Sequence, residues 1–122
     1  MANTFRVITH DVMPASAGTP ETLYTCPSST TAIVLGLIMT NMHTNVVTVD
    51  VILSSDTTTG VNTGAAANNT DMFLLNDTPI PEGSTLEILS GNKLCLQTTD
   101  ILKIDCSIAD KVSVALTIME IT

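Results

Sequence analysis

The strongest β-strand signal in this chain is the stretch Thr31–Thr40, which reads TAIVLGLIMT. Successive side chains of a strand point to opposite faces, so its residues divide into two sets. One set is Ile33, Leu35, Leu37 and Met39, and the other is Val34, Gly36, Ile38 and Thr40. Because both sets are largely apolar, the stretch predicts a strand covered on both sides, by a second sheet or by another subunit.

The next strand signal follows a short turn at Asn41–Asn45. In the stretch Val47–Ser54, VTVDVILS, large apolar side chains alternate with a second set that is mostly polar. This alternation is typical of a half-buried strand. Because the connection is short, the sequence predicts a hairpin in which this stretch pairs with Thr31–Thr40.

Further short alternating stretches lie on both sides of these two. They are Phe5–Thr9, Leu23–Thr25, Met72–Leu75, Thr85–Leu89, Lys93–Gln97, Ile101–Cys106 and Lys111–Ile121. In the last one the apolar phase shifts after Ile118, which predicts a bulge there or burial on both faces. Eight or nine short strands separated by frequent turns predict one all-β domain over residues 1–122, an antiparallel β-sandwich or jelly roll.

Composition and charge exclude several classes of function. Only 13% of the 122 residues are charged, and the net charge is −8. The basic residues are too few to bind phosphates, so we expect no nucleic-acid partner. The longest apolar run, Ala32–Met39, is far shorter than the roughly 20 residues of a membrane-spanning helix. We expect no membrane partner and a soluble protein that is made and kept in the cytoplasm.

No catalytic or metal-binding motif is present in the sequence. His10 and His43 lie in unrelated contexts, and neither accompanies a nucleophile motif. The three cysteines, Cys26, Cys95 and Cys106, lack the close spacing of a zinc site, and we expect reduced thiols packed as small hydrophobic residues. The sequence therefore predicts no enzymatic activity, no catalytic residue, no metal and no cofactor.

A long polar loop covers about residues 54–70. It has almost no large apolar side chain and is rich in Thr, Asn, Gly and Ala. Loops of this length are uncommon in compact domains unless they bind something or move. Two interpretations stay open, a mobile hairpin tip and an interaction loop. The second assigns contacts to Thr57, Thr58, Thr59, Asn68 and Asn69.

Further candidate interface residues come from the strands with apolar side chains on both faces. They are Val34 and Ile38 in the strand at Thr31–Thr40, and Met119 and Ile121 in the last strand. Burial against another subunit would explain them. The alternative is that the opposite sheet of the same sandwich covers them.

Two groups of strand and turn motifs carry a family resemblance. The first is Leu23–Pro27 (LYTCP), Thr30–Val34 and Thr40-Asn41, and the second is Pro79–Glu87, Lys93–Leu96, Asp100–Ile104 and the closing Glu120-Ile121. Over about residues 20–122 the chain resembles small virion structural proteins of tailed bacteriophages, particularly cyanophage-like ones. The resemblance implies a component of a phage particle.

The residues and the resemblance together favour a capsid decoration, or cement, protein. It would be assembled in the host bacterial cytoplasm and bind across capsid subunits as a homo-oligomer, with a trimer favoured. Its partners would be its own copies and a major capsid or other virion protein. One alternative is a tail, neck or baseplate protein. Another is a host-surface or carbohydrate-binding module, although the sequence has only Tyr24, Phe5 and Phe73 as aromatic platforms.

Overall fold

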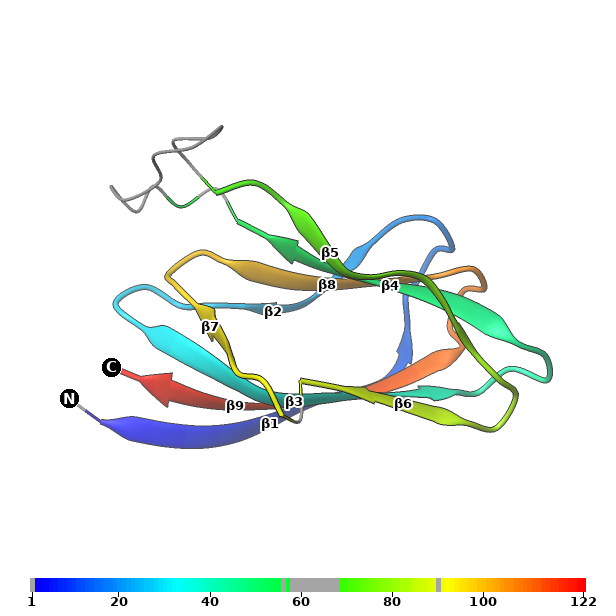
Figure 1. Cartoon of the computed structure of the whole chain (residues 1–122), viewed down its shortest axis with the longest axis horizontal. Helices are drawn as coiled ribbons and strands as arrows, with labels where there is room; N and C mark the ends of the chain where they lie inside the picture. Colours follow the sequence, from blue (N-terminus) through cyan, green and yellow to red (C-terminus); the bar gives the residue numbers. More distant parts are fainter. Residues whose placement is uncertain (1, 56, 58–68, 90) are drawn as a thin grey trace.

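The computed structural model describes residues 2–55, 57, 69–89 and 91–122. These residues form nine β-strands and no helix (Figure 1). The strands are β1 (Asn3–Met13), β2 (Glu21–Thr25), β3 (Thr31–Asn41), β4 (Val47–Ser54), β5 (Met72–Ile80), β6 (Thr85–Ile88), β7 (Leu94–Leu96), β8 (Ile101–Cys106) and β9 (Val112–Ile121).

The strands form two antiparallel sheets that pack face to face, as the two layers in Figure 1 show. The five-stranded sheet has the order β1-β9-β3-β6, and β7 also pairs with β3. The four-stranded sheet has the order β2-β8-β4-β5. The pairs are nested, with β4 against β5, β3 against β6 and β7, β2 against β8, and β1 against β9. Nested pairs that alternate between two sheets are the topology of a jelly roll, which confirms the predicted fold class.

The predicted hairpin between Thr31–Thr40 and Val47–Ser54 is wrong, because β3 and β4 lie in different sheets. The connection crosses from one layer to the other, and the buried side chain of Asn41 holds it. Asn41 Nδ2 donates to the carbonyl oxygens of Asn45 and Ile80, each at 2.9 Å, and Asn41 Oδ1 accepts from the His43 N–H at 2.7 Å. The short turn is therefore a crossover between the sheets. There the side-chain amide of Asn41 makes hydrogen bonds in place of those of a strand ladder.

The two faces predicted for β3 are also wrong, because a bulge interrupts the strand. Val34 pairs with Ile118, but the next pair joins Gly36 to Thr117, so Leu35 is an extra residue. The bulge reverses the alternation, and the inward residues are Ala32 and Val34 before it and Leu37, Met39 and Asn41 after it. Val34 has no exposed surface and belongs to the core, so a partner could not contact it.

The last strand has no bulge near Ile118, where one was predicted. The bulge lies in the neighbouring strand β3, at the position that pairs with Ile118 and Thr117. The inward residues of β9 alternate without interruption, and they are Val112, Val114, Leu116, Ile118 and Glu120. The apparent phase shift arises because the last inward residue is an acid, while its neighbours Met119 and Ile121 are apolar residues on the outward face.

The core fills the space between the sheets and is apolar. Among its fully buried side chains are Val34, Leu37, Met39, Leu102, Ile104, Leu116 and Ile118. Cys26 and Cys106 are buried free thiols, and burial raises the pKa of each, which makes them poor nucleophiles. The expectation that all three cysteines pack as hydrophobic residues is wrong for Cys95, which is exposed on the short strand β7.

The bulge in β3 gives a stability prediction that sequence alternation alone does not. We expect Val34→Ala to lower the free energy of unfolding by about 2 kcal/mol, because it leaves a cavity in the core. We expect Ile38→Ala, at a side chain that is 41% exposed, to cost clearly less although it removes more atoms. Urea denaturation followed by circular dichroism measures both. Equal losses would place the two residues on one face and contradict the bulge.

Candidate functional site

The outward face of β1, β9 and β3 in the five-stranded sheet is an uncharged surface that the strand register defines. Residues opposite each other in the ladder share a face, so the register identifies its members. We call this set the neutral face. It consists of Asn3, Phe5, Val7 and Thr9 of β1, Ser113, Ala115, Thr117, Met119 and Ile121 of β9, and Thr31, Ile33, Ile38 and Thr40 of β3. None of these side chains is ionisable, in a chain whose net charge is −8.

A row of apolar side chains crosses the neutral face. Phe5 pairs with Met119, Met119 pairs on its other side with Ile33, and Ile33 pairs with the exposed Cys95 of β7. Side chains at paired positions lie about 4.5–5.5 Å apart at Cβ, so the row is continuous across four strands. Phe5 is 69% exposed and Val7, next to the row, 64% exposed. Exposed apolar side chains gathered in this way are typical of an interaction surface.

The inward side of the same strands carries a buried carboxylate that ties the two sheets together. Glu120 Oε1 lies 2.5 Å from Arg6 Nε, and the hydroxyl of Tyr24 donates to Glu120 Oε2 at 2.6 Å. The Tyr24 hydrogen bond, followed by that of Arg6, lowers the pKa of Glu120. Burial, followed by the hydrogen bond to Glu120, raises the pKa of Tyr24. Because Tyr24 lies on β2, this cluster joins β1 and β9 to the opposite layer.

A second buried carboxylate anchors the described ends of the polar segment after β4. Asp100 Oδ1 accepts from the hydroxyls of Ser55 at 2.6 Å and Thr57 at 2.9 Å, and Oδ2 accepts from the Gln97 N–H at 3.0 Å. Asn69 donates from its backbone N–H to the carbonyl of Thr57 at 2.9 Å and from its side chain to Ser55 Oγ at 3.2 Å. Thr57 and Asn69 thus serve as anchors at the base of the segment.

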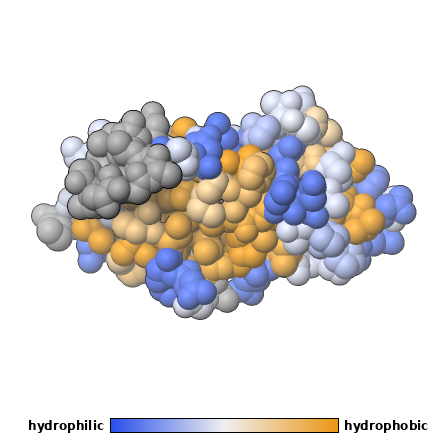
Figure 2. Space-filling view, turned by 45° about the horizontal axis from the view of Figure 1, so that its top comes forward, coloured by the Kyte–Doolittle hydropathy of each residue, from blue (hydrophilic) through white to orange (hydrophobic). Residues whose placement is uncertain are grey.

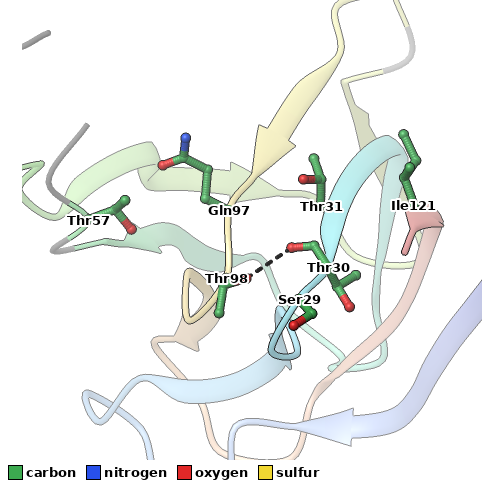
Figure 3. A pocket seen from close by; sticks show the side chains of 7 residues that line it. All are labelled: Ser29, Thr30, Thr31, Thr57, Gln97, Thr98 and Ile121. Carbon is green, nitrogen blue, oxygen red and sulfur yellow. Dashed lines mark hydrogen bonds between the residues drawn. The ribbon is translucent and has the colours of Figure 1, made fainter. Parts of the chain in front are cut away.

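A pocket of about 470 Å³ lies at the end of the sandwich between the β2–β3 and β7–β8 connections (Figure 3). It is lined by Ser29, Thr30, Thr31, Thr57, Gln97, Thr98 and Ile121. The hydroxyl of Thr98 donates to the carbonyl of Thr30 at 3.2 Å across it. The lining residues offer hydroxyl and amide groups but no general base, so this pocket can hold a neutral polar group without acid–base chemistry.

Over the described residues, no group of three or more His, Cys, Asp or Glu side chains could hold a metal ion. In the same residues no helix is long and apolar enough to cross a membrane. His10 Nε2 lies 3.2 Å from Glu21 Oε2 at the sandwich edge. This contact joins β1 to β2 at the surface of the sandwich.

The structure separates the residues predicted for an interface. Ile38, Met119 and Ile121 lie together on the neutral face, and Val34 is in the core. Thr57 and Asn69 lie at the anchored base of the polar segment. Thr58, Thr59 and Asn68 lie outside the described residues.

Sequence reasoning missed Phe5, Val7 and Ile33 as members of the neutral face. The alternation in the opening strand was visible, but nothing local shows which side of a strand faces outward. The usable signal was Arg6, whose inward position is explained only by the distant Glu120. Pairing Arg6 with Glu120 would have placed Arg6 on the inward side of the strand. Its neighbours Phe5 and Val7 would then lie on the outward side.

No known protein family matches this chain, and no curated protein matches it in sequence. Solved structures that share its fold include two particle or appendage proteins. One is a protein of the Bacillus endospore appendages, which form a family of disulfide-linked pili, with a TM-score of 0.51, 13% identity, and coverage of 99% of this chain and 87% of that one. The other is a protein of the IBDV viral particle, with a TM-score of 0.54, 12% identity, and coverage of 97% of this chain. This chain spans only 30% of that particle protein's length.

The Glu120 cluster predicts a pH-dependent contribution to stability. The pKa of Glu120 is lowered in the folded state, so its contribution is present above the unfolded-state pKa of about 4.3 and is lost as the pH falls through the folded-state value. We expect Glu120→Gln to lower the unfolding free energy by about 1.5–3 kcal/mol at pH 7. The difference from the parent protein should shrink steadily below about pH 4.

Chemical denaturation across that pH range measures the effect. Glu87→Gln is the matched control, because Glu87 is an exposed acid on β6 and should show no such difference. A Glu120→Gln penalty that stays constant down to acid pH would contradict the charged cluster.

Proposed function

We propose that this chain is a non-enzymatic structural protein of a phage particle, and that it decorates the capsid by binding across neighbouring subunits. The observation that carries the proposal is the neutral face, an uncharged surface of a jelly roll that is crossed by a row of apolar side chains with Phe5 and Val7 exposed. The resemblance of its strand and turn motifs to small phage virion proteins supports the phage particle as the location. The shared fold with a viral particle protein and a pilus-type appendage protein is consistent with this role.

The stabilisation would come from buried surface and not from chemistry. Apolar side chains such as Phe5 and Val7 gain free energy when a partner removes them from water. The nested strand pairing holds the face rigid, so little conformational entropy is lost on binding. A decoration protein of this kind would clamp capsid subunits through many identical contacts, in which repetition strengthens a weak single contact.

The positions of the acidic groups support the same proposal. The buried carboxylates of Glu120 and Asp100 are occupied by structural hydrogen bonds. Asp105 is also buried and accepts from the N–H groups of Gly18 and Cys106. The exposed acids, with Glu87 at the rim of the neutral face, would meet solvent or basic patches of the capsid. The absence of enzymatic activity is part of the proposal, supported by a pocket whose lining residues provide no general base.

Two alternatives remain distinct from capsid decoration. A tail, neck or baseplate protein would use the same face against different neighbours. A host-surface or carbohydrate-binding module has less support, because Tyr24 is buried with its hydroxyl bound to Glu120 and cannot serve as a stacking platform for a sugar. The polar pocket would be its site, and its lining includes no aromatic side chain.

Quantitative mass spectrometry of purified particles tests the proposal. We expect the chain in hundreds of copies per particle, because a decoration protein repeats with the capsid lattice. A few to dozens of copies would favour a neck or tail position. Absence from purified particles would contradict both structural roles.

A further inference from the structure

We propose that the neutral face binds the same face of a second copy, so that two chains form a twofold-symmetric dimer through their five-stranded sheets. This inference rests on the proposed function only in treating the neutral face as an assembly surface, and it names the partner of that face.

The charge distribution favours a second copy as the occupant. In a twofold contact each residue near the axis faces the same residue of the other copy, so any charge there meets a like charge. The chain has a net charge of −8, yet the outward positions of β1 from Asn3 to Thr9, of β9 and of β3 carry no charge. The exposed acid Glu87 pairs with Ile38 only at the rim, on β6. A basic partner, in contrast, would find carboxylates only at the margins of this face, at Glu87 on β6 and at Asp11 beyond Thr9 on β1.

The size of the face fits a protein–protein contact. β1, β9 and β3 lie about 4.8 Å apart, and β6 and β7 add a fourth row along β3. With about eight residues per row at about 3.3 Å per residue, this side of the sheet measures roughly 500 Å² in projection. Side chains roughen that plane, which brings it near the roughly 800 Å² of accessible surface that each partner loses in a standard interface. The row Phe5–Met119–Ile33, next to the row Asn3–Ile121–Thr31 at one end of the face, would supply the aromatic and Met side chains that are enriched in interfaces.

The edge of the sheet is a weaker candidate than its face. β1 is an edge strand that could pair with another chain through its free backbone groups. However, Arg6 occupies an inward position on this edge and is held by Glu120, and the register of β1 shifts between His10 and Met13. Inward charges and bulges are two devices that prevent edge-to-edge pairing. Association through the face avoids both.

A second apolar surface lies on the other side of the molecule and is also a weaker candidate. Figure 2 shows hydrophobic surface across the middle of a view that brings the four-stranded sheet forward. On β5, the edge strand of that sheet, Leu74 and Leu75 are partly buried against the chain's own core. The exposed apolar residues Met72 (47%) and Phe73 (52%) follow the exposed acid Asp71. A twofold contact there would bring like charges together.

Analytical ultracentrifugation of the intact chain tests the dimer. We expect the unmodified protein to sediment as a dimer at micromolar concentration, and Phe5→Asp to weaken the dimer about 100-fold or more, because it buries an unpaired charge in the contact. Phe5 is 69% exposed, so the variant should stay folded, with the circular dichroism spectrum of the parent and a cooperative unfolding transition. Phe73→Asp is the matched control, the same substitution at a phenylalanine that is 52% exposed, and should leave the dimer intact.

Each other outcome overturns the inference. A monomer, or the trimer that the sequence favoured, contradicts the twofold contact. Loss of the dimer in Phe73→Asp but not in Phe5→Asp moves the interface to the four-stranded sheet. If a mixture of the two variants associates although neither does alone, the contact joins two different surfaces. If the chain is a monomer in solution but abundant on purified particles, the dimer is refuted and the proposed function is not. If the chain is a dimer in solution but absent from particles, the proposed function is refuted and the dimer is not.

Discussion

The architecture depends on the alternation of side chains along β9, the strand that pairs with β1 on one side and β3 on the other. Its inward side chains, from Val112 to Ile118, are core residues, and its outward ones form the middle of the neutral face. A shift of one residue in register would exchange the two sets. The bulge at Leu35 preserves this division, because it takes up one extra residue in β3 and leaves β9 uninterrupted.

Local patterns were enough to predict the fold class and most strands, since period-two alternation is a local property. Three features depended on partners far away in sequence. The bulge in β3 is defined by its pairing with Ile118 and Thr117, and the crossover after β3 by the hydrogen bond from Asn41 to Ile80. Glu120 looked like a break in phase because its partners, Arg6 and Tyr24, precede it by about a hundred residues. None of these could be inferred from neighbouring residues alone.

The candidate site was partly predictable for the same reason. Met119, Ile121 and Ile38 were identified as apolar residues without an obvious core position, and the structure gathers them on one face. Phe5, Val7 and Ile33 complete that face only once the ladder between β1, β9 and β3 is known. An interface is a property of the sheet, and its members come from strands at opposite ends of the chain. The buried carboxylates of Asp100, Asp105 and Glu120 are all held by structural hydrogen bonds, and the neutral face carries no charge, which is the basis of the proposed assembly role.

Hydroxyl-radical footprinting of the chain in its assembled state tests that role most directly. The chain provides two matched pairs of oxidisable side chains, Phe5 and Met119 on the neutral face, and Phe73 and Met72 on β5. If the neutral face is the assembly surface, Met119 becomes protected relative to the Phe5→Asp monomer, and Phe5 becomes protected relative to the unassembled parent protein. Phe73 and Met72 keep their labelling. Unchanged labelling of Phe5 and Met119 in the assembled state would contradict the account.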